Sequence, residues 1–330
     1  MRYSGSVGPL LLVLAVSIQI GCRSVSSPDA EFFPPWDVDR AHVVRWSADD
    51  SSFEQDFAIE ASGLAASRGL LFAPSEKYGR LLLVNAIDDE MQVKNVRLAV
   101  PPHSELEGVA LVDGGVLLCD EAHAAVYEVM IEDEQRLFAA TDPAPLPVRN
   151  LDLEGVAVRG GKIGFEGIEV DPEDGTVHLL LERSGDDSSG CKSRIWSLRR
   201  TAGALRSDGD PIDVVLEDCA WRLTGLAWWK GRLIALKTQF PGERYKIVAV
   251  DLETGNTESL LDLTNLLRSL ARKGWSNNVE GIALGGDGSL WLVADNAVTG
   301  VIDNPLPPQI ERRTLLLRLP PTSSKQKADR

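Results

Sequence analysis

The sequence predicts an all-β fold, a β-propeller of five blades with six as the alternative, and three observations predict it. A short pattern recurs, in which a Glu, Thr or Ser precedes a glycine and an apolar strand. The glycines of five copies are 45 to 59 residues apart, which is close to the roughly 40–50 residues of a propeller blade. The copies extend over most of the 330 residues, so one β domain over residues 41–319 accounts for the length. These glycines are Gly63, Gly108, Gly167, Gly225 and Gly281.

Each copy has the form of a strand, a tight turn and a second strand that ends in polar residues. The clearest copy begins at residues 278–284, turns through Gly-Asp-Gly and ends with the strand over residues 290–296. The weakest begins at Ser62. Further strands around Glu154 and over residues 212–216 stand outside the copies, and they keep the six-blade alternative open.

Residues 1–22 differ from the rest of the chain and predict a signal peptide. Arg2 supplies a positive charge, a mostly apolar run covers residues 9–20, and Gly21-Cys22 follows. Gly-Cys at this place is typical of a bacterial lipoprotein, in which Cys22 becomes the lipidated N-terminus, and ordinary secretion is the alternative. We therefore expect an exported protein tethered in the bacterial envelope, in the periplasm or at the cell surface, with the lipid as its membrane contact.

The ends of the predicted β domain have their own signals. Residues 23–40 are rich in Ser, Pro and acidic residues, which predicts a linker. A strand is expected over residues 41–46, and it can close the ring by pairing beside residues 314–319. The polar segment 320–330 is expected to be a disordered tail.

One inserted helix is expected over residues 259–272. Its leucines recur at three- and four-residue steps, as on one face of a helix, and Lys273-Gly274 offers a C-cap. We expect this helix to pack on one face of the propeller, with a lid over the central channel as the alternative. The leucines of the main stripe are Leu260, Leu263, Leu267 and Leu270.

Three cysteines follow Cys22. Cys119 lies in an apolar strand and is expected to be a buried thiol. Cys191 and Cys219 stand in polar surroundings, and an exported protein allows a disulfide between them.

The formal net charge of −15 argues against nucleic acid or an anionic membrane surface as a partner. The charge is compatible with cation binding, and it equally suits solubility outside the cytoplasm. We expect a monomer whose partner is a small polar or phosphorylated ligand or an envelope protein.

Several familiar catalytic patterns are absent from the sequence. It contains no Gly-x-Ser-x-Gly nucleophile motif and no His-Glu-x-x-His zinc motif. The four histidines are scattered without ligand spacing, and His178 lies in an apolar strand, where a packed side chain is expected.

The repeated glutamate is the strongest candidate for chemistry. Glu107, Glu166 and Glu280 occupy the same place in three copies, and the first strands of propeller blades line the central channel. Carboxylates that meet there repel one another unless a cation or protons compensate, and oxygen ligands suit calcium. The alternative is that each glutamate caps a turn of its own blade. Glu154, 12 residues before Glu166, is a second candidate for the channel.

The polar ends of the second strands form another candidate set. Their mixed charges suit a polar or phosphorylated ligand, with Arg183 and Lys237 as its anion partners. Strand ends that merely face water are the alternative. The set comprises Asn85, Asp120, Glu121, Glu182, Arg183, Lys237, Asp295 and Asn296.

The copies that start with Glu107-Gly108 and Glu166-Gly167 resemble the phytase-like family, described by the esterase-like activity of phytase, over roughly residues 55–319. This resemblance implies an exported, calcium-associated β-propeller that hydrolyses phosphoesters. The Glu-Gly starts and Asp-Asn strand end also resemble the gluconolactonase and senescence-marker propellers. That resemblance implies a lactonase whose calcium is held by Glu107 or Glu280 with Asn85 and Asp295.

Three functions remain open on the sequence. The first is a calcium-dependent hydrolase of phosphoesters, esters or lactones. The second is a non-catalytic propeller that binds a ligand or a protein in the envelope. The third is a structural lipoprotein in which a channel ion only holds the blades together. The channel carboxylates favour the first function, whereas the absence of a histidine base or a nucleophile motif favours the other two.

Overall fold

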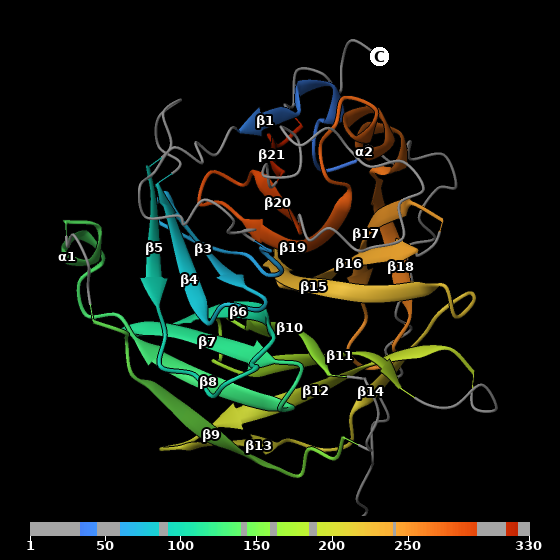
Figure 1. Ribbon diagram of the computed structural model, residues 1–330. Coiled ribbons are helices and arrows are strands. Elements are labelled where there is room, and N and C mark those ends of the chain that lie inside the picture. The colour runs from blue at the N-terminus through green and yellow to red at the C-terminus, as the bar shows by residue number, and fades with distance from the viewer. Residues whose placement is uncertain are drawn as a thin grey trace, which may run out of the picture. The chain divides into compact units, whose positions relative to one another are not determined.

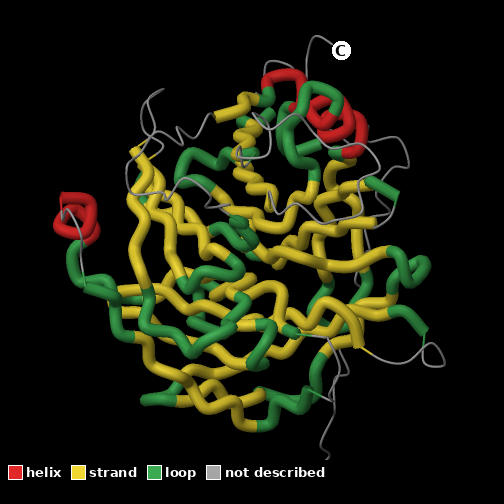
Figure 2. Tube along the Cα trace, viewed as in Figure 1, coloured by secondary structure: helices red, strands yellow, loops and turns green. Residues whose placement is uncertain are grey.

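The computed structural model describes residues 34–44, 60–85, 92–139, 144–158, 164–184, 190–239, 242–295 and 315–322. Strands make up most of these ranges (Figure 2). No helix among them is long and apolar enough to cross a membrane. The predicted signal peptide and Cys22 lie outside the described residues.

Strands that follow one another in the chain pair as antiparallel runs of four. The first two runs are β2 (Ala65–Ser67), β3 (Leu70–Ser75), β4 (Arg80–Asn85) and β5 (Gln92–Arg97), then β6 (Leu106–Val112), β7 (Gly115–Asp120), β8 (Ala125–Met130) and β9 (Val148–Glu154). The next two are β10 (Phe165–Val170), β11 (Val177–Ser184), β12 (Lys192–Arg200) and β13 (Ala204–Ser207), then β15 (Trp221–Trp229), β16 (Arg232–Gln239), β17 (Arg244–Val250) and β18 (Thr257–Asp262). The last run is β19 (Asn278–Leu284), β20 (Leu290–Asp295), β21 (Leu316–Leu319) and β1 (His42–Val44).

Two runs are joined edge to edge. Strand β13 pairs in parallel with β9, and β14 (Ile212–Val215) pairs with β12. Tight turns connect the strands within a run. Gly114 has φ +75° between β6 and β7, and Gly231 has φ +73° between β15 and β16. Glycine adopts this left-handed conformation without a steric cost.

The first strand of each run lies innermost, and these strands contact one another in the closed order β2, β6, β10, β15, β19 and back to β2 (Figure 1). The repeated glycines allow this approach. A Cβ at Gly63 would lie 2.4 Å from the carbonyl oxygen of Glu107, and one at Gly225 would lie 2.6 Å from that of Glu280. A Cβ at Gly281 would lie 2.7 Å from the carbonyl carbon of Gly63. The predicted β-propeller fold is confirmed, and the number of blades stays a prediction.

The ring is closed by the two ends of the described chain. Strand β1 pairs antiparallel with β21, so that Val43 faces Leu317. This is the pairing that the sequence predicts between residues 41–46 and 314–319. The same sheet therefore contains the first and the last described strands of the chain.

Packing extends beyond the predicted domain bounds at both ends. Trp36 is 1% exposed and donates from its indole Nε1 to the carbonyl oxygen of Gly288 at 3.0 Å, and a 3₁₀ helix follows at Val38–Arg40. The linker prediction over 23–40 is therefore wrong for residues 34–40. The backbone N–H of Thr322 donates to the carbonyl oxygen of Pro35 at 3.0 Å, so the tail prediction over 320–330 is wrong for its first three residues.

The helix predicted over 259–272 is shorter in the structure. Residues Thr257–Asp262 form β18, the outer strand beside β17, and α2 covers only Thr264–Ala271. Leu260 and Leu261 are both buried in the β18 position, so tertiary packing overrides the helical spacing of these leucines. A short helix that the sequence analysis misses, α1, lies at Glu134–Ala139 (Figures 1 and 2).

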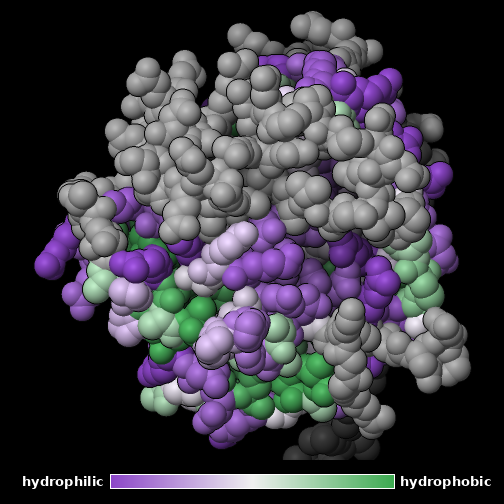
Figure 3. All heavy atoms as spheres, in the orientation of Figure 1, coloured by the Kyte–Doolittle hydropathy of each residue, from purple (hydrophilic) through white to green (hydrophobic). Residues whose placement is uncertain are grey.

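Apolar side chains between neighbouring runs form the core. Phe165 and Trp196 pack edge to face with ring centroids 6.1 Å apart, and Cys119 is a fully buried free thiol, as predicted. A disulfide joins Cys191 and Cys219, which confirms that pairing. In the view of Figure 3, hydrophilic residues cover much of the described surface and hydrophobic residues gather on its lower part.

Candidate functional site

A β-bulge occurs at the same place in the inner strands. The register of β19 against β20 shifts between Val279 and Gly281, which leaves Glu280 without a partner across the ladder. Equivalent shifts leave Glu166 in β10 and Thr224 in β15 unpaired, and the register of β6 shifts around Glu107. A bulge redirects a side chain and is common beside functional sites. The repeated Glu-Gly and Thr-Gly pairs of the sequence are these bulges.

The structure brings the three repeated glutamates together. Glu107, Glu166 and Glu280 are 5%, 7% and 9% exposed, respectively. Burial raises the pKa of Glu107 well above its ordinary value, and the charges of Glu166 and Glu280 raise it further. Burial likewise raises the pKa of Glu166 well above the ordinary value. The three carboxyl groups are thus buried and near enough for the charges of Glu166 and Glu280 to act on Glu107.

Arg222, which the sequence analysis overlooks, lies among these acids. It stands near the start of β15, two residues before Thr224. Its guanidinium donates from Nη1 to Oε1 of Glu182 at 2.7 Å and from Nη2 to Oε1 of Glu280 at 3.3 Å. Burial lowers the pKa of Arg222, but the charges of Glu280, Glu182 and Glu166 outweigh this and raise it. Arg222 is thus a permanent cation within the group.

Glu280 has a second polar partner on its own strand. Asn278 donates from Nδ2 to Oε1 of Glu280 at 3.0 Å and to Oδ2 of Asp295 at 3.3 Å. Burial raises the pKa of Glu280 to about 8, although Arg222 lowers it, and the charge of Asp295 adds to the rise. Asp295 thus belongs to the same site, at the end of β20 that faces the start of β19.

Two predicted residues from the ends of second strands complete the site. Glu182, at the end of β11, accepts from Arg222 and raises the pKa of Glu166 by its charge. Glu121 follows β7, and burial together with the charge of Glu182 raises its pKa to about 6. We call Glu107, Glu121, Glu166, Glu182, Glu280 and Arg222 the axial cluster.

A further acid near the cluster is missed by the sequence analysis. Glu76 follows β3, and burial raises its pKa, with Lys77 lowering it and Asp295 raising it. Lys77 pairs with Glu76 at 3.2 Å. In the sequence repeat, the strand that ends at Asn85 is expected at this place. However, Asn85 ends β4, the third strand of its run, and it pairs with Leu70 at the start of β3. Asn85 therefore lies at the opposite end of the sheet.

Other predicted residues have local roles. Glu154 lies on β9, is exposed, and pairs with Arg206 at 2.7 Å, so Glu166 and not Glu154 lines the channel. Asp120 is fully buried and accepts from the phenol of Tyr127 at 3.0 Å, as well as from the imidazole of His123 if that nitrogen carries the proton. Asp120 therefore stabilises the turn that follows β7.

The two predicted anion partners both have acidic neighbours. Lys237 is 3% exposed and pairs with Glu217 at 2.6 Å, with its ammonium over the ring of Trp221. Arg183 is half exposed and lies 3.8 Å from the carboxylate of Glu182. Asn296 lies outside the described residues. Lys237 is thus paired with Glu217, and Arg183 with Glu182 of the axial cluster, and their role as anion partners stays a prediction.

The polar groups of the axial cluster differ in how well they are satisfied. Glu182 and Glu280 accept hydrogen bonds from Arg222. In contrast, the described part of the chain provides no hydrogen-bond donor to the carboxyl group of Glu107 or Glu166. The buried hydroxyl Oγ1 of Thr224 also has no partner there. Burying the Thr224 hydroxyl without a partner is costly, and a ligand or an ion would satisfy it together with the two carboxyl groups.

The described residues contain no group of three or more His, Cys, Asp or Glu side chains placed to hold a metal ion. The fit to a hard cation is therefore partial. Glu107, Glu166 and Thr224 offer oxygen atoms of the type that calcium prefers, whereas Glu280 is already held by Arg222. In proton chemistry, the cluster combines carboxyl groups whose pKa values are about 6 and about 8. These two values lie on either side of pH 7, and a carboxyl group is best suited to acid–base catalysis when its pKa is near the working pH.

Comparisons with known proteins agree with this architecture. A family model described as "Phytase-like: Esterase-like activity of phytase" matches residues 87–297. A search of curated proteins gives no match.

Solved structures with similar folds have low sequence identity. Glutaminyl cyclase from Myxococcus xanthus is 14% identical, with 86% of this chain and 97% of that chain covered and a TM-score of 0.49. The PQQ-bound aldose sugar dehydrogenase from Streptomyces coelicolor is 15% identical, with coverage of 87% and 100% and a TM-score of 0.47. An engineered GH43 glycoside hydrolase is 9% identical, with coverage of 83% and 54% and a TM-score of 0.50. At such identity the likeness concerns the fold alone.

Proposed function

The chain belongs to the phytase-like family, described by the esterase-like activity of phytase, and on this basis we propose that it is a cation-dependent hydrolase of small phosphoesters or esters. The proposal places the reaction at the axial cluster. The observation that carries it is the pair Glu107 and Glu166, two buried acids with raised pKa values and no hydrogen-bond donor among the described residues.

The charge balance of the cluster supports a bound cation. Arg222 supplies one positive charge, and it is directed to Glu182 and Glu280. Glu107 and Glu166 repel each other unless protons or a second cation compensate. Calcium takes six to eight oxygen ligands, and Glu107, Glu166 and the hydroxyl of Thr224 would supply part of this set. Binding would draw these side chains closer together, and the remaining ligands would be water or substrate oxygens.

The residues of the cluster would divide the chemistry among them. A bound calcium would polarise the ester and lower the pKa of a water molecule. Glu121, with a pKa of about 6, would accept a proton near neutral pH. Arg222 would hold Glu182 and Glu280 in place and contribute positive charge next to a phosphate oxygen. Lys77, which pairs with Glu76 nearby, is a second cation within the same neighbourhood.

A second candidate function is a non-catalytic ligand-binding or protein-binding propeller of the envelope. The ion pairs of Arg222 favour it, because they already neutralise part of the cluster without a metal. The calcium-dependent lactonase is less well supported, because its proposed ligand Asn85 lies at the other end of the sheet. In either case we propose a monomer that is exported and tethered through Cys22.

The test compares calcium binding and hydrolysis in matched variants. Purified protein is first treated with chelator, and its melting temperature is followed as calcium is added. Wild-type protein should gain stability by mass action, whereas Glu166→Gln should respond weakly. Glu154→Gln, a change at an exposed glutamate paired with Arg206, should respond like wild type.

Hydrolysis of p-nitrophenyl phosphate and p-nitrophenyl acetate is measured on the same samples with calcium and with chelator. Calcium-dependent turnover that Glu166→Gln loses and Glu154→Gln keeps would support the hydrolase. A calcium response without turnover would favour the structural-ion alternative and reject the catalytic part. If metal-free protein shows neither a calcium-dependent gain in stability nor turnover, the proposed cation itself is rejected.

A further inference from the structure

A cavity of about 600 Å³ lies at the opposite end of the inner strands from the axial cluster. Its walls come from the five innermost strands, the turn after β10 and the adjoining ends of β11 and β12, and we call it the distal pocket. We propose that the distal pocket binds a small organic ammonium ion, an amine nitrogen on an apolar body, with Glu169 as its counter-ion. The lining includes Ala66, Leu111, Glu169, Trp228 and Leu284.

Glu169 is an acid that has no counter-charge among the described residues. It lies on β10, three residues after Glu166, which corresponds to about 10 Å along a strand. Its Oε1 accepts from the backbone N–H of Val170 at 3.0 Å. Across the part of the chain that the structure describes, it has no ion pair. Burial raises the pKa of Glu169 to about 8. The ligand best suited to stabilise its ionised form is a cation.

The other charged groups around the distal pocket are also mainly acidic. Asp113 and Asp171 line it, and the cation that lines it, Arg200, donates to the carboxylate of Glu128. His178 lies directly across the β10–β11 ladder from Glu169. Burial lowers the pKa of His178, which favours the neutral form of its imidazole. The lining therefore favours a positive ligand over a negative one.

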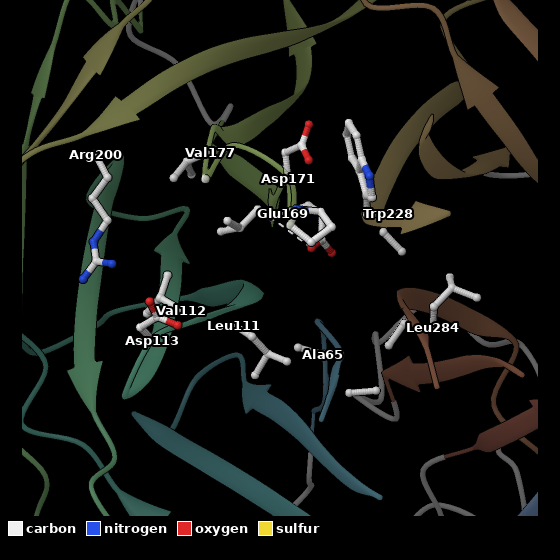
Figure 4. Close-up of a pocket in the computed structure, with 16 residues that line it drawn as sticks. Ala65, Leu111, Val112, Asp113, Glu169, Asp171, Val177, Arg200, Trp228 and Leu284 are labelled. Carbon is white, nitrogen blue, oxygen red and sulfur yellow. Dashed lines mark hydrogen bonds between the residues drawn. The ribbon is translucent and has the colours of Figure 1, made fainter. Parts of the chain in front are cut away.

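The remaining surface of the distal pocket suits an apolar body. Alanine, valine and leucine side chains make up most of its wall. Figure 4 shows Asp171 and Trp228 on one side of the cavity, with Leu111, Ala65 and Leu284 facing them. The ring of Trp228 is stacked on His178, with centroids 5.5 Å apart and planes 8° from parallel. An indole held in this way offers a flat apolar surface, and an indole face also attracts cations.

The distal pocket is separate from the axial cluster. Ile168 and Leu226 are 1% and 3% exposed, and they lie between the two ends on β10 and β15. A volume of about 600 Å³ is within the range of ligand sites, roughly 300–1,000 Å³. The ammonium site therefore does not depend on the hydrolase proposed above.

The experiment uses benzylamine as the probe and benzyl alcohol as its uncharged counterpart, with binding measured by calorimetry on the full chain. Benzylamine should bind at least tenfold more tightly than benzyl alcohol. Because Glu169 must lose a proton to pair with the amine, the Kd for benzylamine should fall by about tenfold between pH 6 and pH 7. Proton release should also make the heat depend on the ionisation enthalpy of the buffer.

Variants separate the distal pocket from other acidic sites. Glu169→Gln should weaken benzylamine binding at least tenfold and leave benzyl alcohol unchanged, while Glu166→Gln should leave both unchanged. Ala66→Leu, which keeps Glu169 and takes up space in the pocket, should weaken both ligands. This last variant keeps the test decisive if Glu169→Gln fails to fold. Equal binding of amine and alcohol to the wild type, or amine binding that survives Ala66→Leu and Glu169→Gln, would overturn the proposal.

Discussion

Arg222 donates to Glu182 at 2.7 Å and to Glu280 at 3.3 Å, so one side chain of β15 links acids from the runs on either side of its own. The guanidinium is 18% exposed, and the two carboxylates are 12% and 11% exposed. Screening by water is weak at this burial, in contrast to ion pairs on the surface.

Replacing Arg222 by Met should destabilise the protein by about 3–5 kcal/mol, because the change leaves buried carboxylates without their cation. Urea unfolding monitored by tryptophan fluorescence measures this loss. Arg194→Met removes a more exposed pair with Asp213 and should cost about 1 kcal/mol or less. Adding Glu280→Gln to Arg222→Met should restore part of the stability. Equal losses of unfolding free energy in the two single variants would show that the buried ion pairs stabilise the protein no more than the exposed pair.

The glycine contacts of the inner strands predict a second effect. Gly281→Ala should lower the free energy of unfolding by about 2–4 kcal/mol or prevent folding, since overpacking at a rigid contact is costly. The new Cβ would meet the backbone of Gly63 at 2.7 Å and Cγ1 of Val293 at 2.6 Å. Gly286→Ala is the matched control, because a Cβ there has no neighbour within 4 Å. Similar melting temperatures for the two variants would contradict the close approach of β19 and β2.

The raised pKa of Glu169 predicts how stability depends on pH. Its carboxyl group has a pKa of about 8 in the folded protein against an ordinary 4.5, so the folded state holds a proton that the unfolded state has released. The stabilisation is complete below pH 4.5 and is lost as the pH rises through 8, at about 1.4 kcal/mol per pKa unit.

Denaturant unfolding at pH 5, 7 and 9 measures this slope. The free energy of unfolding of the wild type should fall over this range, and that of the Glu169→Gln variant should fall less steeply. Glu154→Gln, at an exposed position, should keep the slope of the wild type. A slope that Glu169→Gln leaves unchanged would mean that Glu169 is ionised in the folded protein at neutral pH.

The proposed tether gives a prediction for the cell. Cys22→Ser should move the protein from the membrane fraction to the soluble fraction, because a lipid can no longer be attached. Cell fractionation followed by immunoblotting measures this. Cys119→Ser is the control, since that thiol is buried in the fold. Wild-type protein that is fully soluble after lysis would contradict lipidation.

Much of the fold can be predicted because the sequence repeat marks equivalent positions in successive runs of strands. The Glu-Gly pairs mark both the bulges and the contacts between inner strands, so one short pattern locates Glu107, Glu166 and Glu280 together. The closing pair of β1 and β21 is also predictable, since a propeller needs a partner for its last strands. The repeat is informative because every copy faces the same geometric demand.

The failures occur where one copy departs from the others. Arg222 has no counterpart in the repeat, and a single arginine near a strand start carries no pattern. Pro74 lies within β3 and obscures that strand, so Asn85 is assigned to the place that Glu76 holds. Leucines of residues 257–262 have helical spacing, yet β17 offers them an open edge. The distal pocket is assembled from separate strands, and local sequence gives little sign of it.

The pairing of β1 with β21 sets a condition on the order of folding. Val43 and Leu317 are neighbours in one sheet but stand far apart in the chain. During synthesis, β1 emerges early, whereas its partner β21 is made almost last. The loop that must close between them spans nearly the whole domain, and its entropy cost grows only slowly with length. The final, cooperative step of folding can therefore occur only after the whole domain has been synthesised. A chain that ends before residue 316 would lack the strand that pairs with β1, and its ring would stay open.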